Sequence, residues 1–283
     1  MLLYSFLLVV AWIILAQCSM KFRVPDKIAL ERFSTADVQL FTGTFNTGHY
    51  QLHFAQTGND TLPTLFFVHG TPGSWMKFGK YLQDKDLLKK YRMVSVDRPG
   101  FGYSQFADAR NLEQQSEIIT ALLHHLQNGK PIYAIGRSFG GPLVVRLAED
   151  NPVMFSGLVL LAAALDPATE KKYSWRPLFF KTPLNYFIPG AWRTSNEELW
   201  YLKNDLQELK KKAAAINCPV YILHGDADGM VPVSNAAYGK KMLVNAKPVY
   251  LSIISGAHHH IPDDHYEMVK EILMNLDADG TAK

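Results

Sequence analysis

The chain has 283 residues, of which 48% are hydrophobic and 19% are charged, and its formal net charge is +3. This composition is that of a globular domain with a sizeable core, and it excludes a disordered or fibrous chain. The mild positive charge and the lack of a long basic run give no indication of a nucleic-acid partner. We therefore expect one α/β domain that carries an insertion.

Residues 1–18 form a signal-like or lipoprotein-like segment. The run from Leu2 to Ala16 is almost entirely apolar, but it is short for a membrane span and no Lys or Arg precedes it. Its end, Leu15-Ala16-Gln17-Cys18, fits a small-x-small cleavage site before Ser19 and, apart from Gln17, resembles a bacterial lipoprotein box. Export, with or without lipid on Cys18, is the leading expectation and would place the protein in the periplasm or cell envelope of a bacterium. The alternative is membrane attachment by an uncleaved anchor, for which the basic residues after the run favour a cytoplasmic catalytic domain.

Residues 19–48 are interpreted as a connecting arm with a short helix at Asp26 to Phe33. Apolar runs then alternate with helical patterns up to residue 276. The expected strands are Tyr50–Ala55, Thr64–Val68, Met93–Val96, a run that begins at Ile132, Phe155–Ala162, Val220–Leu223 and Pro248–Ile254. The expected helices are Met76–Lys90, Asn111–Gln127, Leu143–Glu149, Asn235–Val244 and Asp263–Asn275. This alternation predicts an α/β fold, with a mostly parallel central sheet and helices on both faces, built from residues 49–164 and 218–276.

A Gly-x-Ser-x-Gly pattern lies between the strand at Ile132 and the helix that follows it. The pattern is Gly136-Arg137-Ser138-Phe139-Gly140, so it predicts a strand, a tight turn and a helix. Glycines on both sides allow the strand and the helix to approach closely, which leaves the Ser138 hydroxyl exposed on a strained turn. Ser138 is therefore a candidate nucleophile. The Phe139 N–H and the positive end of the helix are suited to stabilising a negative oxygen.

Two further loops follow the ends of buried strands. The loop from His69 to Trp75 is rich in glycine and proline, so the backbone N–H of Thr71 can approach a ligand and supply a second oxyanion donor. The second loop begins with Asp97 and Arg98, which we interpret as a structural pair that holds it. Ser104 in this loop lacks a following helix and is interpreted as a structural hydroxyl.

Residues 165–217 interrupt the alternation of strands and helices. The segment carries many aromatic side chains, namely Tyr173, Trp175, Phe179, Phe180, Tyr186, Phe187, Trp192, Trp200 and Tyr201. An aromatic-rich insertion between two core strands is typical of a lid that packs its own small core and lines an apolar pocket. We expect residues 165–217 to form such a lid.

A carboxylate and a histidine complete the chemistry that a serine nucleophile needs. Asp226 and Asp228 follow the strand that ends near Leu223, and three consecutive histidines, His258, His259 and His260, follow the last strand. A serine hydroxyl becomes nucleophilic when a neutral imidazole takes its proton, and a carboxylate orients that imidazole. The order along the chain is serine, acid, histidine.

Four motifs, each after a strand, carry a resemblance to a known family. They are His69-Gly70-Thr71-Pro72-Gly73, Asp97-Arg98-Pro99-Gly100-Phe101-Gly102-Tyr103-Ser104, Gly136-Arg137-Ser138-Phe139-Gly140-Gly141 and His224-Gly225-Asp226-Ala227-Asp228-Gly229-Met230-Val231-Pro232. Over roughly residues 49–276 the chain resembles an α/β-hydrolase fold serine hydrolase. The resemblance implies Asp228 as the acid, with Asp226 as the alternative, and His259 as the histidine, with His258 as second choice.

The resemblance also implies a reaction. A triad of Ser138, His259 and Asp228 would cleave an ester, or less readily an amide, through an acyl-serine intermediate, with the Thr71 and Phe139 N–H groups as oxyanion donors. No cofactor and no metal are expected, and the partner is a small ester-like molecule. The serine argues against epoxide hydrolase and haloalkane dehalogenase chemistry, where the family uses an aspartate. A non-catalytic binding protein with this fold is the alternative function.

Overall fold

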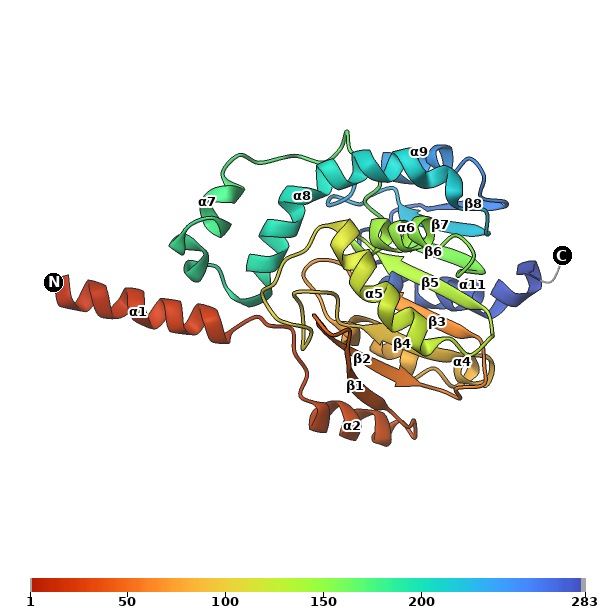
Figure 1. The fold of residues 1–283 in the computed structure, drawn as a ribbon, viewed down its shortest axis with the longest axis horizontal. Coiled ribbons are helices and arrows are strands. Elements are labelled where there is room, and N and C mark those ends of the chain that lie inside the picture. Colours follow the sequence, from red (N-terminus) through yellow and green to blue (C-terminus); the bar gives the residue numbers. More distant parts are fainter. Residues whose placement is uncertain (1, 281–283) are drawn as a thin grey trace.

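The computed structural model describes residues 2–280, which form an eight-stranded sheet covered by helices (Figure 1). The strand order is β1-β2-β4-β3-β5-β6-β7-β8. The strands are β1 Phe41–Asn46, β2 Gln51–Thr57, β3 Thr64–Val68, β4 Arg92–Val96, β5 Ile132–Arg137, β6 Gly157–Leu161, β7 Val220–Gly225 and β8 Val249–Ile254. Strand β2 runs antiparallel to β1 and β4, and all the other pairs are parallel. The predicted mostly parallel sheet is confirmed.

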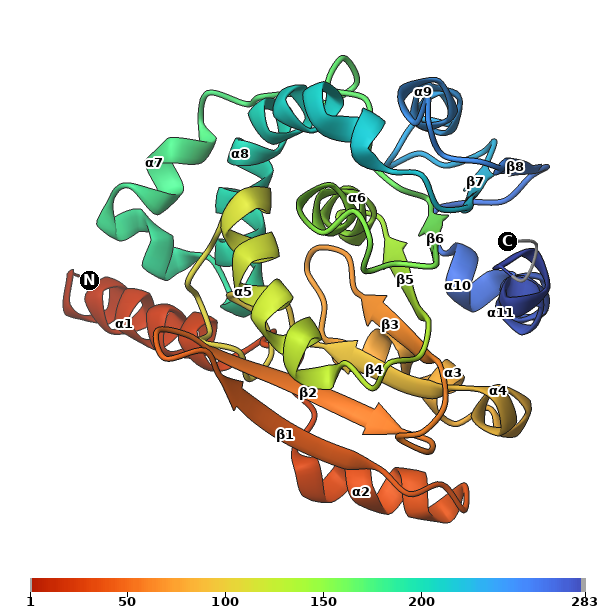
Figure 2. The ribbon, with the colours of Figure 1, turned by 45° about the vertical axis from the view of Figure 1, so that its right-hand side comes forward.

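Helices connect and cover the strands. They are α1 Leu2–Cys18, α2 Asp26–Thr35, η1 Trp75–Phe78, α3 Gly79–Leu82, α4 Lys85–Lys90, α5 Leu112–Leu126, α6 Gly140–Asp150, α7 Arg176–Phe180, η2 Pro183–Phe187, α8 Gly190–Lys212, η3 Ala213–Ala215, α9 Ser234–Met242, α10 Ile261–Asp264 and α11 Tyr266–Gly280. One apolar cluster packs α5, α6 and α8 on one face of the sheet, and a second packs α4 and α11 on the other face (Figure 2). Strands β3 to β7 are buried along their whole length because both faces are covered.

Three expected elements differ from the structure. The arm of residues 19–48 holds an edge strand, β1, whose side chains are mostly exposed and therefore give little apolar signal. The helix expected at Met76–Lys90 is three short helices, because the Asp84 carboxylate caps a new helix by accepting hydrogen bonds from Asp86 N and Leu87 N. The expected last helix is divided into α10 and α11.

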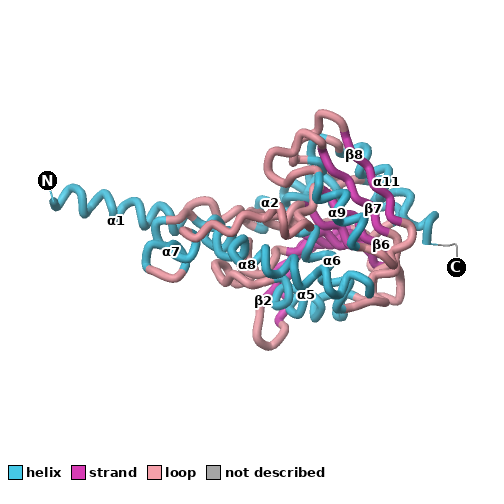
Figure 3. Tube along the Cα trace, turned by 90° about the horizontal axis from the view of Figure 1, so that it is seen from above, coloured by secondary structure: helices cyan, strands magenta, loops and turns pink. Residues whose placement is uncertain are grey.

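The insertion of residues 165–217 lies between β6 and β7 and contains α7, η2, α8 and η3. Helix α1 projects from the same end of the molecule as α7 (Figure 3). Two side chains tie α1 to η2: Trp12 Nε1 donates to the Phe187 carbonyl at 3.1 Å and Gln17 Nε2 donates to the Tyr186 carbonyl at 2.8 Å. No helix within residues 2–280 combines the length and the apolar composition that crossing a membrane requires.

Candidate functional site

The turn between β5 and α6 holds Ser138 in a strained conformation. Its φ is +53°, in the left-handed region that side chains rarely adopt, and its N–H donates to the Leu161 carbonyl at 2.9 Å. A Cβ on Gly136 would lie 2.3 Å from the Gly140 carbonyl oxygen, and one on Gly140 would lie 2.2 Å from the Val68 carbonyl oxygen. Glycine is therefore required at both positions. The turn that the Gly-x-Ser-x-Gly pattern predicts is present.

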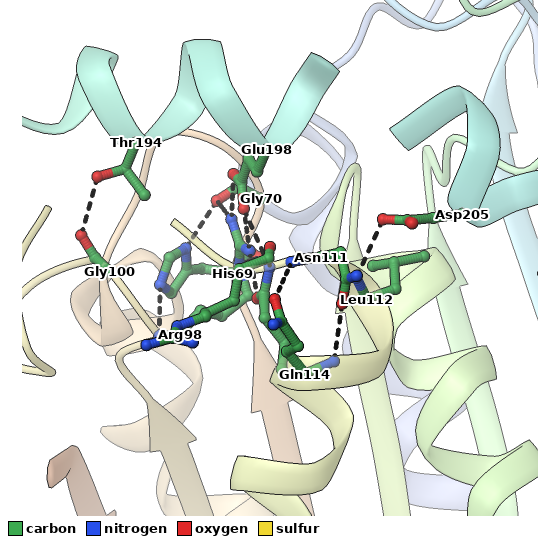
Figure 4. Close-up of polar contacts among 12 residues, drawn as sticks. His69, Gly70, Arg98, Gly100, Asn111, Leu112, Gln114, Thr194, Glu198 and Asp205 are labelled. Atoms are coloured by element: carbon green, nitrogen blue, oxygen red, sulfur yellow. Dashed lines mark hydrogen bonds and ion pairs between the residues drawn. The ribbon is translucent and has the colours of Figure 1, made fainter. Parts of the chain in front are cut away.

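The loop that carries Thr71 is held by a buried polar network (Figure 4). Arg98 Nε donates to the His69 carbonyl at 2.9 Å, and its Nη2 donates to the Gly70 carbonyl at 3.1 Å. The Arg98 backbone N–H donates to His69 Nε2 at 3.0 Å, so the ring proton lies on Nδ1, which donates to the Gly70 carbonyl at 2.7 Å. A Cβ on Gly70 would be 3.0 Å from the Ser138 Cβ. The network thus fixes the loop directly against the turn that carries Ser138.

Burial and the adjacent Arg98 guanidinium lower the pKa of His69 well below its ordinary value. His69 therefore stays neutral at physiological pH, as its hydrogen bonds require. It serves as a rigid link between Arg98 and the loop.

Asp97 and Arg98 were predicted to pair with each other, but each is bound to other groups. The Asp97 carboxylate accepts from Trp75 N at 2.8 Å, Tyr103 N at 2.9 Å and His53 Nδ1 at 2.8 Å. Ser104 is the predicted structural hydroxyl: it is fully buried and donates to the Asp97 carbonyl at 2.7 Å. The loop is therefore held by several backbone and side-chain contacts.

Arg98 is paired with Glu198 of helix α8, and both side chains are fully buried. The two carboxylate oxygens accept from Nη1 at 2.8 Å and Nη2 at 2.9 Å (Figure 4). Gln115 also contacts both partners. Two further contacts join α8 to the core: Thr194 Oγ1 donates to the Gly100 carbonyl, and Asp205 accepts from Leu112 N. The sequence analysis missed Glu198, because nothing in a helical pattern marks which carboxylate meets an arginine 100 residues earlier.

The acid and the histidine meet beyond the ends of β7 and β8. Asp228 Oδ1 accepts from Met230 N at 2.8 Å and Val231 N at 2.9 Å, and Oδ2 accepts from His259 Nδ1 at 2.7 Å. Asp226, the alternative acid, is exposed and accepts from Gly256 N. Both Asp228 and His259 are buried.

The neighbouring histidines face other groups. His258 Nδ1 contacts the Ala227 carbonyl at 2.9 Å, and the His260 ring contacts the Arg137 guanidinium. Arg137 also pairs with Asp263 at 3.0 Å, so the large side chain beside Ser138 is tied to helix α10. Among the three, the ring that contacts Asp228 is that of His259.

Charge and burial set the protonation of this pair. Burial lowers the pKa of His259, and Arg137 lowers it further, although Asp228 opposes both effects. Burial raises the pKa of Asp228, but its hydrogen bonds from Val231, His259 and Met230 outweigh burial and leave the pKa below its ordinary value. At neutral pH the carboxylate is charged and the imidazole is neutral. Because the proton on His259 Nδ1 is hydrogen-bonded to the Asp228 carboxylate, Nε2 carries a free electron pair that can accept a proton.

A cavity of about 380 Å³ brings several predicted residues together. Ser138, Thr71 and Phe139 line it together with residues 229–232, which directly follow Asp228. The buried Thr71 hydroxyl oxygen has no hydrogen-bond partner in the described part of the chain. Residues 2–280 contain no hydrogen bond between Ser138 and His259, so that contact of the expected triad belongs to the proposal below.

The insertion forms one wall of this cavity, and polar side chains stand beside apolar ones in that wall, whereas an apolar lining was expected. Its lining residues are Thr169, Glu170, Lys171, Tyr173, Arg176, Leu199 and Leu202. Tyr173 is the single aromatic residue among them. The cavity is therefore polar as well as apolar, because Glu170, Lys171 and Arg176 line it beside Leu199 and Leu202.

The turn that carries Ser138 and the loops that carry Asp228 and His259 lie together at the carboxyl edge of one sheet. The model of the alpha/beta hydrolase fold matches residues 63–191, which include Thr71 and Ser138. The chain has the α/β-hydrolase fold. Asp228 and His259 lie beyond the matched residues, so the family match does not extend to them.

Individual relatives of this hydrolase are distant. Epoxide hydrolase 1 of Caenorhabditis elegans is 23% identical over 276 residues, with 78% of this chain and 66% of that protein covered. The uncharacterized hydrolase YugF of Bacillus subtilis is 24% identical over 267 residues, with 78% of this chain and 91% of that protein covered. The crystal structure of the Paleococcus ferrophilus monoacylglycerol lipase superposes with a TM-score of 0.64 at 21% identity, covering 80% of this chain and 99% of that chain. These proteins are hydrolases, and so is this chain.

Proposed function

We propose that this hydrolase cleaves carboxylic esters through an acyl-serine intermediate, with Ser138 as nucleophile, His259 as base and acid, and Asp228 as the group that orients His259. The observation that carries the proposal is the buried Asp228–His259 pair at the sheet edge where Ser138 opens into a cavity. A charged carboxylate on Nδ1 leaves Nε2 free to accept the serine proton. A neutral imidazole is the form that this step requires.

The reaction proceeds in two halves. Ser138 Oγ attacks the carbonyl carbon while its proton passes to His259, and the carbonyl oxygen becomes an oxyanion. The N–H groups of Thr71 and Phe139 stabilise this oxyanion, aided by the N-terminus of α6. The C–O bond to the alcohol breaks as His259 protonates the leaving oxygen. Water, deprotonated by His259, then releases the acid and restores Ser138.

An ester suits Ser138 and His259 better than an amide or an epoxide does. An alcohol is a better leaving group than an amine, so an ester places a smaller demand on His259 than an amide does. Epoxide opening in this fold family uses an aspartate where this chain has Ser138, so the activity named for the nematode relative is not proposed for this chain.

Turnover of matched substrates tests this proposal. The purified chain should hydrolyse short p-nitrophenyl esters, and the corresponding anilides should react at least about 100-fold more slowly. Ser138→Ala should abolish ester turnover while leaving the fold intact by circular dichroism. Folded wild-type protein that turns over none of a panel of esters would favour the non-catalytic binding function instead.

We further propose that the N-terminal segment directs the protein to a membrane or across it, with the catalytic domain outside the cytoplasm. The uncharged, apolar run of α1 supports this. Intact-mass measurement on protein from its native host separates the possible fates. Loss of the residues before Cys18 or Ser19 would mean cleavage, added mass on Cys18 would mean lipidation, and a chain that begins at Met1 would mean an uncleaved anchor.

A further inference from the structure

The exposed apolar surface of this protein is concentrated in two segments that lie far apart in the sequence. In α1, Leu3, Tyr4, Phe6 and Leu8 are 63–74% exposed. In the insertion, seven large side chains are 37–50% exposed: Tyr173, Trp175, Leu178, Leu184, Tyr186, Phe187 and Trp192. Contiguous exposed apolar surface of this kind marks a contact with a partner or a membrane.

The two segments form one surface. Besides the bonds from Trp12 and Gln17 to η2, the Ala191 N–H donates to the Met20 carbonyl at 3.0 Å. The chain packs so closely here that a Cβ on Gly190 would lie 2.2 Å from the Ser19 carbonyl oxygen. Figures 1 and 3 show α1 and α7 at the same end of the molecule, away from the sheet. We name residues 171–195 of the insertion the basic aromatic face.

The charged side chains of the two segments that form this surface are all basic. Residues 171–195 contain five basic side chains, Lys171, Lys172, Arg176, Lys181 and Arg193, and no Asp or Glu. Residues 1–25 likewise contain Lys21 and Arg23 and no acidic residue. Within residues 2–280 none of these seven cations forms a salt bridge, whereas many other cations of the chain do. Glu170 attracts Arg176, but no carboxylate within residues 2–280 forms a salt bridge with the exposed Lys171, Lys172 or Lys181, so these lysines are available to a negative partner outside the chain.

We propose that the basic aromatic face binds the surface of a lipid bilayer that contains anionic lipids, beside α1 inserted in the same bilayer. Trp and Tyr side chains favour the boundary between lipid headgroups and hydrocarbon, and Lys and Arg are attracted to anionic headgroups. Helix α1 has 17 residues, which gives a length of about 25 Å, and most of its exposed side chains are apolar. A second copy of the chain fits this surface poorly, because facing copies would bring like charges together.

The surface also adjoins the cavity. Lys171, Tyr173 and Arg176 belong both to the basic aromatic face and to the cavity wall near Ser138. If the proposed ester hydrolysis holds, the binding surface gives the substrate class: an ester that resides in the bilayer reaches Ser138 along this wall. The binding itself does not depend on the proposed hydrolysis.

Sedimentation of the full-length protein with lipid vesicles tests the proposal. One set of vesicles is phosphatidylcholine alone, and the other is phosphatidylcholine mixed with phosphatidylglycerol. The variant Lys172→Glu/Lys181→Glu changes two exposed lysines of the basic aromatic face that do not line the cavity. Its matched control, Lys240→Glu/Lys241→Glu, makes the same charge change on the exposed side of α9.

We expect the wild type to bind the anionic vesicles. Each lysine lost from an anionic membrane surface weakens binding about fivefold, so the loss of two lysines alone weakens it roughly 30-fold, and the two added glutamates should weaken it further. The control variant should stay within about threefold of the wild type. Trp175→Ser/Trp192→Ser should weaken binding to both kinds of vesicle.

Three results would overturn the proposal. In the first, the wild type binds neither kind of vesicle. In the second, Lys172→Glu/Lys181→Glu and the control Lys240→Glu/Lys241→Glu bind anionic vesicles equally well, so α1 alone would account for the attachment. The third is a concentration-dependent dimer, measured by light scattering, that Trp175→Ser/Trp192→Ser dissociates while vesicle binding stays unchanged. Turnover of a soluble ester, measured in parallel, separates a failure of membrane binding from a failure of the proposed hydrolysis.

Discussion

Charged side chains are buried and paired at the carboxyl edge of the sheet, whereas those of the basic aromatic face lie at the surface. At the sheet edge Arg98 and Glu198 are fully buried and bound to each other, and Asp228 has three hydrogen-bond donors. On the basic aromatic face the cations form no salt bridge within residues 2–280, and large apolar side chains face water. A buried polar group must find its partners within the chain, whereas an exposed surface leaves its partner outside. The first region is therefore held together by contacts within the chain, whereas the second exposes its cations and apolar side chains to solvent.

The largest effect is expected at His259. His259→Ala should lower turnover by about four to six orders of magnitude, as Ser138→Ala does, because the members of a triad act as one unit. His258→Ala and His260→Ala should each lower turnover less than about tenfold, since their rings contact other groups. Steady-state kinetics on one ester, with circular dichroism of each variant, is the measurement.

The double variant Ser138→Ala/His259→Ala provides the control for that result. It should be hardly worse than either single variant. If His258→Ala abolished turnover while folded His259→Ala retained it, the base would be His258, and the contact between His259 and Asp228 would have no catalytic meaning.

The second effect concerns the buried pair that joins α8 to the Thr71 loop. Arg98→Met leaves Glu198 buried without its partner, which should cost about 3–5 kcal/mol and lower Tm by roughly 10 °C. Arg98→Met/Glu198→Leu should recover most of that Tm. It should not recover kcat, which we expect to stay about 10- to 100-fold low, because Arg98 also holds the His69 and Gly70 carbonyls. Melting curves and the separate values of kcat and KM are the readouts.

The exposed pair Lys211–Glu208 on the same helix is the matched control. Glu208→Gln should change stability by less than about 1 kcal/mol, as is usual for a surface pair. Recovery of kcat together with Tm in the double variant would mean that Arg98 acts on stability alone.

A third prediction is the pH dependence of kcat/KM. The base must be neutral, and burial holds the pKa of His259 below 6.5, so the rate should be flat near pH 7 and fall about tenfold per pH unit below a midpoint that lies under 6.5. Asp228 raises the pKa of His259, so Asp228→Asn should move this midpoint to still lower pH while lowering the plateau by about 10³- to 10⁴-fold. A midpoint above pH 6.5 in the wild type would contradict a buried neutral base.

The smallest expected effect is a change in the free energy of unfolding. It involves Glu149, which belongs neither to the site at the sheet edge nor to the basic aromatic face. Glu149 of α6 has two buried carboxylate oxygens that lack hydrogen-bond partners within residues 2–280, and burial raises its pKa to about 8. Its neutral form is favoured in the folded state, so its contribution to stability is complete below the unfolded pKa near 4.5 and is lost as pH rises to about 8. Glu149→Gln should therefore stabilise the protein at pH 8 by on the order of 1–3 kcal/mol and hardly at all at pH 4.5. Equal urea unfolding curves at pH 8 would show that Glu149 is solvated.

The sequence predicted those parts of the structure in which a local physical requirement determines the type of residue. The glycines around Ser138 are required by close backbone contacts, and strands β3 and β5 are continuous apolar runs because both faces of the sheet are covered. Asp228 and His259 were chosen by register within a motif, and the structure brings these two into contact.

Long-range partners could not be predicted in this way. The bond between Arg98 and Glu198 depends on how α8 crosses the sheet edge, which no local pattern encodes. The insertion was expected to line an apolar pocket, yet periodicity does not tell which of its side chains line the cavity and which are exposed. Edge strand β1 was missed because its exposed side chains resemble a loop.

The central claim, that Ser138 is the nucleophile, is tested most directly by labelling with a fluorophosphonate. The phosphorus bonds to an activated serine oxygen and displaces fluoride, and peptide mapping by mass spectrometry locates the adduct. We predict that one adduct forms, on Ser138, and that folded His259→Ala is labelled at least about 1,000-fold more slowly. An adduct on another residue, or none on folded wild-type protein, would contradict the account.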